Sequence, residues 1–236
     1  MGTELENLKE ALDYTLFWEY RGLLLKGLAF NFYVWALAAV LAAALGFAAC
    51  LLRVSRWWAA RAVGTFHTEL FRNTPEYILL IWVHFVLPLL LTLLLSTNVN
   101  FSPFLSAVLA LGFAYSGYLA ETFRSGIQAI PRGHADAGRA LGMPGFLIMW
   151  RIILPQAVRH VLPELLNQMV SLFKATTLIS LIAVPDLLYN VVIVTQEEMR
   201  PLPLYTYAAL VYCALIFGAS ALVRRLSRDW RTRGWA

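Results

Sequence analysis

Charged residues are scarce in this sequence. Asp, Glu, Lys and Arg make up 14% of the 236 residues, whereas 60% are hydrophobic. A soluble domain carries roughly 25% charged residues, so this composition excludes a chain whose whole surface faces water and indicates a polytopic membrane protein. The formal net charge of +5 needs no nucleic acid to explain it, because Lys and Arg collect on the cytoplasmic connections of membrane proteins.

Cysteine and histidine are few, and several catalytic and binding motifs are missing. Cys50 and Cys213 lie far apart in apolar runs, without the spacing of a disulfide framework or a metal site. The four histidines are scattered, and no nucleophile is grouped with a base at membrane depth. The phosphate-binding motif G-x-x-x-x-G-K-[ST] is absent. We therefore expect no metal site, no cofactor and no enzymatic activity in this chain.

Long apolar runs dominate what is present. Each is long enough to form a helix that crosses a bilayer, which takes about 20 residues. The fourth run is interrupted by polar residues, and Pro88 is expected to kink the second. The sequence predicts an all-α membrane protein with a transmembrane domain over 23–225 and five spans, at 27–52, 75–95, 103–122, 161–184 and 204–223.

The basic residues sort to one side of these five spans. Arginines gather after the first, third and fifth spans, whereas the N-terminal segment and the other connections carry more acidic than basic residues. By the positive-inside rule, the N-terminal segment 1–22 is expected in the periplasm and the basic tail 226–236 in the cytoplasm. An even number of spans would scramble this sorting, so the charge pattern independently supports five.

The longest connection, 124–160, contains a second predicted feature. Ala135, Ala137 and Ala140 favour a short helix, and Gly142 suits the position of positive φ that ends one. Pro144 opens a second short helix, which is expected to end or bend near Pro155. The product is a helix–turn–helix at the membrane surface. It is either an ordinary interfacial linker or a compact protrusion shaped for a partner's groove.

The sequence DAGRALGMPGFLIMWRIILP at 136–155 decides between these alternatives by resemblance. It resembles the cytoplasmic EAA loop of the permeases of ATP-binding-cassette (ABC) importers, whose pattern is E-A-A, three residues, G, nine residues, I-x-L-P. The matching residues, in order, are Asp136, Ala137, Gly138, Gly142, Ile152, Leu154 and Pro155. Asp replaces Glu and Gly replaces the second Ala, which keeps the charge in one case and the small size in the other.

Other stretches are similar to the polar amino-acid subgroup of these permeases, the histidine, glutamine, glutamate and arginine type. They are FRNTP at 71–75, YLAETFRSGIQAIPRG at 118–133, LPELLNQMVSLFKATTLISLI at 162–182 and VPDLLY at 184–189. The subgroup commonly has an apolar residue where Glu76 stands and Gln where Leu79 stands. This departure bears on the substrate class.

The resemblance implies a type I importer permease fold in the bacterial inner membrane. It also implies several partners: a second permease subunit, identical or different, two copies of an ATPase that binds ATP and Mg²⁺, and a periplasmic solute-binding protein. Polar amino acids would cross by alternating access. The coupling loop would be 130–156, and the residues expected to contact the ATPase are His134, Ala135, Asp136, Ala137, Gly138, Arg139, Ala140, Leu141 and Gly142.

Lys174 is the main candidate for a residue in the substrate pathway. A charged residue in a membrane span costs at least about 2.5–3.5 kcal/mol and is functional or paired. The alternative is that Lys174 pairs with Glu164 or with a backbone carbonyl at the subunit interface, and that nearby hydroxyls aid helix packing. The other predicted pathway residues are Asn167, Gln168, Ser171, Thr176, Thr177 and Tyr115, although an aromatic residue in a span is often plain packing.

Glu121 and Arg124 lie three residues apart, so they are neighbours on one helix face. We expect either a stabilising ion pair or a contact of a gate.

At the level of the whole protein, the alternative to an importer subunit is a stand-alone secondary transporter or channel for small polar solutes. Such proteins show inverted repeats or paired ion sites, and the sequence shows no convincing internal repeat.

Overall fold

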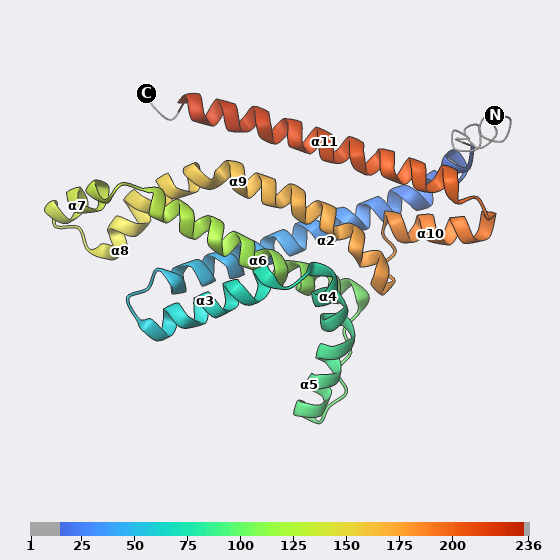
Figure 1. Ribbon diagram of the computed structural model, residues 1–236, viewed down its shortest axis with the longest axis horizontal. Coiled ribbons are helices and arrows are strands. Elements are labelled where there is room, and N and C mark those ends of the chain that lie inside the picture. Colours follow the sequence, from blue (N-terminus) through green and yellow to red (C-terminus); the bar gives the residue numbers. More distant parts are fainter. Residues whose placement is uncertain (1–14, 234–236) are drawn as a thin grey trace. The chain divides into compact units, whose positions relative to one another are not determined.

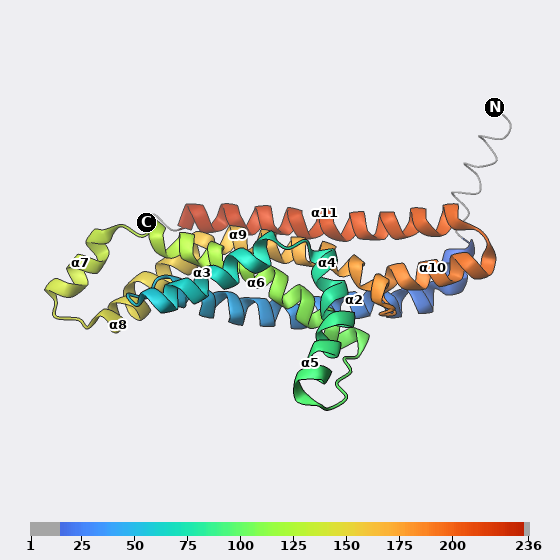
Figure 2. The same ribbon diagram turned by 60° about the horizontal axis from the view of Figure 1, so that its bottom comes forward.

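The computed structural model describes residues 15–233, and every regular element within them is a helix (Figures 1 and 2). The predicted segments 1–22 and 226–236 therefore lie partly outside the described residues. The α-helices are α2 (Thr15–Arg53), α3 (Trp58–Asn73), α4 (Glu76–Ile81), α5 (Leu87–Leu95), α6 (Pro103–Ala129), α7 (Arg132–Ala140), α8 (Gly145–Ile148), α9 (Leu154–Ala175), α10 (Leu187–Glu198) and α11 (Pro201–Arg233). Two π-helices, η1 (Trp82–Val86) and η2 (Met149–Ile153), and one 3₁₀ helix, η3 (Thr176–Ile182), connect some of them.

The predicted all-α fold with five spans is confirmed. Five helical segments of the described chain are long and apolar enough to cross a membrane: Thr15–Arg53, Glu76–Leu95, Pro103–Ala129, Gly145–Ile182 and Pro201–Ser227. Two of these are not regular α-helices throughout. The second contains the π turn η1, which ends two residues before Pro88, and the fourth runs through η2 and η3. Proline and π turns are the usual causes of such interruptions, because both break the ladder of backbone hydrogen bonds.

The chain forms two compact units. Unit 1 consists of Met1–Ala38, Glu76–Leu111 and Leu172–Ala219, and unit 2 of Ala39–Pro75, Gly112–Ser171 and Ser220–Ala236. The core of unit 1 brings together apolar side chains of α2, the end of α9, α10 and α11. They are Leu16, Leu24, Phe173, Leu187, Val191, Val194, Leu204, Ala208 and Tyr212. Phe173 packs against Phe32, with ring centroids 4.9 Å apart.

In unit 2, α3 packs against α6. The Phe71 and Phe113 rings stack with centroids 5.1 Å apart, and His67 Nε2 lies 2.8 Å from the hydroxyl of buried Ser116. Ser116 donates its own proton to the carbonyl oxygen of Phe113, 2.6 Å away, so the His67 ring must be the donor in the first bond. Burial lowers the pKa of the His67 imidazole, which favours the neutral form.

Candidate functional site

Residues 132–148 form a protrusion that we call the knob. Helix α7 ends at Ala140, and the chain turns at Gly142, whose φ is +73°. The Gly142 N–H donates to the Arg139 carbonyl at 2.9 Å, and the Met143 N–H donates to the Gly138 carbonyl at 3.0 Å. Helix α8 then begins after Pro144. This agrees with the predicted turn, because glycine adopts the left-handed conformation at no steric cost. The second helix does not end at Pro155: α8, η2, α9 and η3 follow one another as a single helical segment, Gly145–Ile182, so the fourth span begins before the predicted residue 161.

Gly138 explains one departure from the family pattern. It is the buried residue of α7, and a Cβ atom added to it would lie 2.9 Å from Cγ1 of Ile148 and 3.0 Å from Cδ1 of Ile152. The close approach of α7 to α8 and η2 therefore leaves no room for alanine without a shift of these side chains. The glycine at position 138 therefore fits the close packing between α7 and the helical segment that follows the turn.

The outer surface of the knob combines an apolar tip with a charged flank. Leu141, in the turn, is 80% exposed and Phe146, in α8, is 72% exposed. Asp136 and Arg139 form an exposed ion pair with an N–O distance of 2.5 Å, and such pairs contribute little to stability. Of the predicted coupling residues, Gly138 is buried and Ala135 half-buried, and the exposed ones are His134, Asp136, Ala137, Arg139, Ala140, Leu141 and Gly142.

Glu121 and Arg124 form the ion pair that their spacing predicts. Nε of Arg124 donates to Oε2 of Glu121 at 3.1 Å, and Nη2 donates to Oε1. A third residue joins them, since Arg53 Nη1 donates to the same Oε2 at 2.5 Å. Arg53 comes from the end of α2, so the carboxylate ties α2 to α6 within unit 2. The ion pair is observed, whereas the choice between a stabilising pair and a contact of a gate stays a prediction. No sequence spacing pointed to Arg53.

A buried polar cluster lies in unit 1, and sequence reasoning missed it. Asn31 is fully buried, and its Nδ2 donates to the carbonyl and hydroxyl oxygens of Thr176 and to Oδ2 of Asp186, at 3.1–3.3 Å. Its Oδ1 accepts from the Leu187 N–H at 3.2 Å and from the Tyr212 hydroxyl at 3.3 Å. The Asn31 cluster thus connects α2, η3, the start of α10 and α11.

Asp186 gives the Asn31 cluster a pH dependence. Burial raises the pKa of this carboxyl to about 6, although hydrogen bonds from the Tyr189 N–H and from Asn31 act in the opposite direction. Unfolded Asp titrates near 3.9. Because the folded state holds the proton more tightly than the unfolded state, protonation of Asp186 contributes on the order of 2–3 kcal/mol to the free energy of unfolding. This contribution is complete below about pH 4 and is lost as the pH rises through about 6.

We therefore expect the unfolding temperature in detergent to fall between pH 4 and 6.5 more steeply in the native protein than in Asp186→Asn. The amide of this variant does not titrate. The comparison rests on the slopes against pH, because the substitution also changes the stability at every pH. Equal slopes in the two proteins would contradict the assignment.

The predicted pathway residues occupy different environments in the two units. In unit 1, Lys174 is exposed and Thr177 is half-buried, whereas Thr176 is buried in the Asn31 cluster. In unit 2, Asn167 is exposed, Gln168 and Ser171 are half-buried and Tyr115 is buried. Gln168 donates to Glu164 at 2.8 Å. Glu164 and Lys174 form no ion pair with each other in the described residues, and the alternative of a pair at the subunit interface stays a prediction. The pathway itself stays a prediction.

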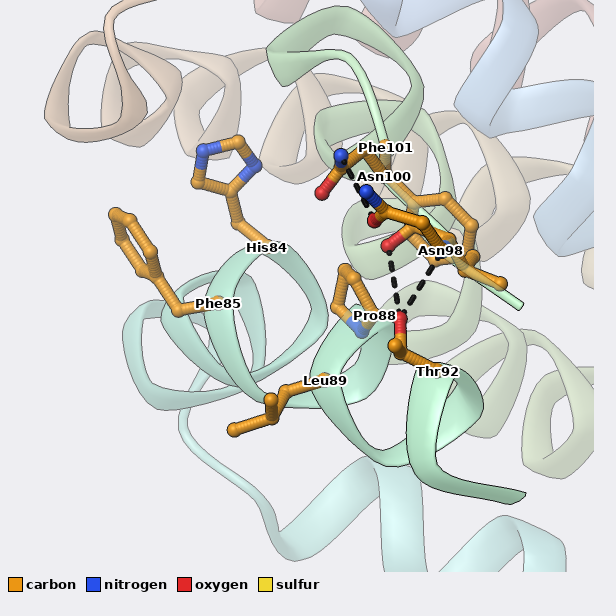
Figure 3. A pocket seen from close by; sticks show the side chains of 9 residues that line it. His84, Phe85, Pro88, Leu89, Thr92, Asn98, Asn100 and Phe101 are labelled. Atoms are coloured by element: carbon orange, nitrogen blue, oxygen red, sulfur yellow. Dashed lines mark hydrogen bonds between the residues drawn. The ribbon is translucent and has the colours of Figure 1, made fainter. Parts of the chain in front are cut away.

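A cavity of about 470 Å³ lies in unit 1, where the chain returns from α5 to α6 (Figure 3). The return segment is held by Thr92, whose hydroxyl accepts from the Val99 N–H at 3.0 Å. Asn100 donates to Asn98 at 3.2 Å. The lining residues are His84, Phe85, Pro88, Leu89, Thr92, Asn98, Val99, Asn100 and Phe101. This lining contains no acidic residue, no Lys and no Arg, so the cavity offers amide and aromatic contacts but no fixed counter-ion.

Comparison with known proteins places these features in a family. The model of the family described as binding-protein-dependent transport system inner membrane component matches residues 37–232. The arginine ABC transporter permease protein ArtQ of Haemophilus influenzae is 35% identical over 162 residues, which cover 69% of this chain and 73% of that protein. ArtQ of Escherichia coli is 30% identical over 217 residues, covering 85% and 90%. A putative glutamine transport system permease protein GlnP of Rickettsia typhi is 29% identical, covering 81% and 85%.

Solved structures give the same result. The fold is similar to that of an amino acid ABC transporter crystallised with histidines, with a TM-score of 0.82 and 27% sequence identity over 92% of this chain and 98% of that one. A methionine ABC transporter in an inward-facing conformation has a TM-score of 0.68 at 18% identity, over 90% of this chain and 98% of that one, which supports the fold alone.

Proposed function

Because this chain belongs to the family of binding-protein-dependent transport system inner membrane components, we propose that it is the permease subunit of an ATP-driven importer of polar amino acids. The observation that carries the proposal is the knob. It combines the spacing of the EAA loop with an exposed apolar tip, on a chain with no phosphate-binding loop of its own. The relatives named for arginine and glutamine transport support the substrate class.

The knob would be the joint through which a separate ATPase drives the permease. Two copies of that ATPase would be present, and ATP and Mg²⁺ would bind to them. An exposed apolar tip flanked by charges is the kind of surface that inserts into a groove of another protein, because burying Leu141 and Phe146 there removes apolar area from water. Closure of the ATPase pair would then move the knob and, through α6 and α9, the membrane spans.

Orientation and location follow from the charge sorting. The arginine-rich connections, including the knob and the Arg224–Arg225 end of α11, would lie in the cytoplasm, and the α10 end of unit 1 in the periplasm. There the solute-binding protein would deliver its ligand. With a second permease subunit, this chain would surround a central pathway in the bacterial inner membrane. The exposed residues Asn167 and Lys174 and the half-buried Thr177 are its candidate lining.

The proposal is tested by reconstituting the chain in lipid vesicles with the ATPase and the solute-binding protein that copurify with it from its native membrane. We expect accumulation of labelled arginine or glutamine against a gradient that requires ATP. Accumulation should fall to background when the phosphate-binding Lys of the ATPase is replaced. Uptake that persists with this inactive ATPase, driven by an ion gradient, would instead establish a secondary transporter.

A further inference from the structure

Lys174 and Glu76 are among the charged side chains of unit 1 that have no partner in the described part of the chain, as are the exposed Glu19, Lys26 and Glu197. The ammonium of Lys174 is exposed and forms no hydrogen bond or ion pair within residues 15–233. The carboxylate of Glu76 is half-buried and likewise has none. Both lie in helical segments that can cross a membrane. An ionised group at membrane depth is costly unless a counter-charge or a wet pathway faces it.

These two residues lie on neighbouring elements. Glu76 is the first residue of α4, and Lys174 immediately precedes the last residue of α9, where the chain tightens into η3. Helix α4 packs against η3 within unit 1 (Figures 1 and 2). On α4, Glu76 shares its face with Leu79 and Leu80, which are three and four residues along and are both buried. The unpaired carboxylate therefore lies at one end of the face that α4 turns toward its unit.

The backbone around Lys174 is held firmly. The Thr177 hydroxyl donates to the Lys174 carbonyl at 2.8 Å, and the Thr176 hydroxyl donates to the Phe173 carbonyl at 2.7 Å. Thr176 is in turn fixed by Asn31. Phe173, the residue before Lys174, is buried in the core of unit 1. The fixed backbone places the Cα atom of Lys174 for a ligand, so that binding has to order the side chain of this residue and not its backbone.

From this juxtaposition, and resting on the proposed function, we infer that Lys174 and Glu76 together recognise the zwitterionic head group of the amino acid. The Lys174 ammonium binds the α-carboxylate, and the Glu76 carboxylate binds the α-ammonium. The two protein charges are not paired with each other, so each is available. Their opposite signs match the two charges that every α-amino acid carries, whatever its side chain.

This assignment gives a role to a departure from the family pattern. Where the subgroup commonly has an apolar residue, this chain has Glu76, and where the subgroup has Gln it has Leu79. A carboxylate at 76 adds a counter-charge on the element that packs against η3. The head group is then bound by this chain, and the side chain of the substrate is left to other contacts.

The test measures ligand binding to the detergent-purified complex of permease and ATPase, without the solute-binding protein. The probes are L-arginine, L-argininamide, which lacks the carboxylate, and Nα-acetyl-L-arginine, which lacks the ammonium. We expect the native complex to prefer L-arginine to either analogue by roughly 10- to 100-fold, because each analogue loses one charge-assisted hydrogen-bonded contact.

The variants separate the two contacts. Lys174→Met should reduce the preference over argininamide to within about twofold and keep the preference over the acetylated analogue, whereas Glu76→Gln should do the reverse. Glu19→Gln and Lys26→Met remove an exposed carboxylate and an exposed ammonium of α2 and should keep both preferences. If Lys174 and Glu76 only form an ion pair with each other, the double variant Lys174→Glu with Glu76→Lys, which exchanges the two charges, should restore native binding. That result would overturn the inference.

The outcomes also separate this inference from the proposed function. If the native vesicles accumulate amino acids with ATP but both single variants keep both preferences, the inference fails and the importer assignment stands. If the native complex binds neither arginine nor glutamine and the vesicles accumulate neither, the importer assignment for polar amino acids fails first.

Discussion

Asn31→Leu is expected to lower the free energy of unfolding by about 3–5 kcal/mol, because it leaves several buried groups without partners at once. Leucine has the same number of side-chain heavy atoms and the same branching at Cγ as asparagine, and it suits an apolar span, so hydropathy alone would favour it. The loss comes from the groups that Asn31 now satisfies. These are the Leu187 N–H, the Tyr212 hydroxyl and Oδ2 of Asp186, and an unsatisfied buried polar group costs about 1–3 kcal/mol.

The measurement is unfolding of the purified protein by titration with SDS in mixed micelles, followed by circular dichroism. Asn98→Leu is the matched control, since Asn98 is exposed and its side chain accepts one hydrogen bond from Asn100. Its free energy of unfolding should stay within about 0.5 kcal/mol of the native value. An Asn31→Leu protein as stable as the control would show that the Asn31 cluster does not hold α2 to η3 and α10.

The five spans were predictable because each is an apolar run of sufficient length, and hydropathy needs no knowledge of tertiary contacts. Helix α3 was not predicted. Its sequence, WAARAVGTFHTELFRN, is mixed in polarity and short, so it resembles a loop when only span-length apolar runs are sought. The structure shows the reason for its helical periodicity, which places Phe71 and His67 on the side that packs on α6.

The local parts of the candidate site were also accessible from sequence. Gly142 at the turn of the knob and the Glu121–Arg124 pair depend on spacings of a few residues, which the helix repeat fixes. Arg53 and the Asn31 cluster depend on contacts between residues 68 to 181 positions apart. A single sequence carries no signal for such pairings. The presence of Asn31 in an otherwise apolar run was the one hint available, because a polar residue in a span requires a partner.

Replacing the apolar tip of the knob should have the largest functional effect. In the double variant Leu141→Asp with Phe146→Asp, we expect the affinity for the ATPase to fall at least about 100-fold and ATP-driven uptake to fall to background. Central apolar anchors of an interface are often worth 2 kcal/mol or more each, and two carboxylates would have to be buried unpaired. Both side chains are highly exposed in the chain itself, so its own folding should be unaffected.

Copurification of the ATPase with the tagged permease measures docking, and amino-acid-stimulated ATP hydrolysis measures coupling. Arg56→Asp is the matched control, because it places new negative charge on another exposed turn of unit 2 and should leave both unchanged. Ala137→Arg adds a bulky charge on the exposed face of α7 and should weaken docking in the same direction. If the double variant and Ala137→Arg retained both docking and ATP-coupled accumulation, force would have to enter the permease elsewhere, and the knob would be no more than a connection between α6 and α9.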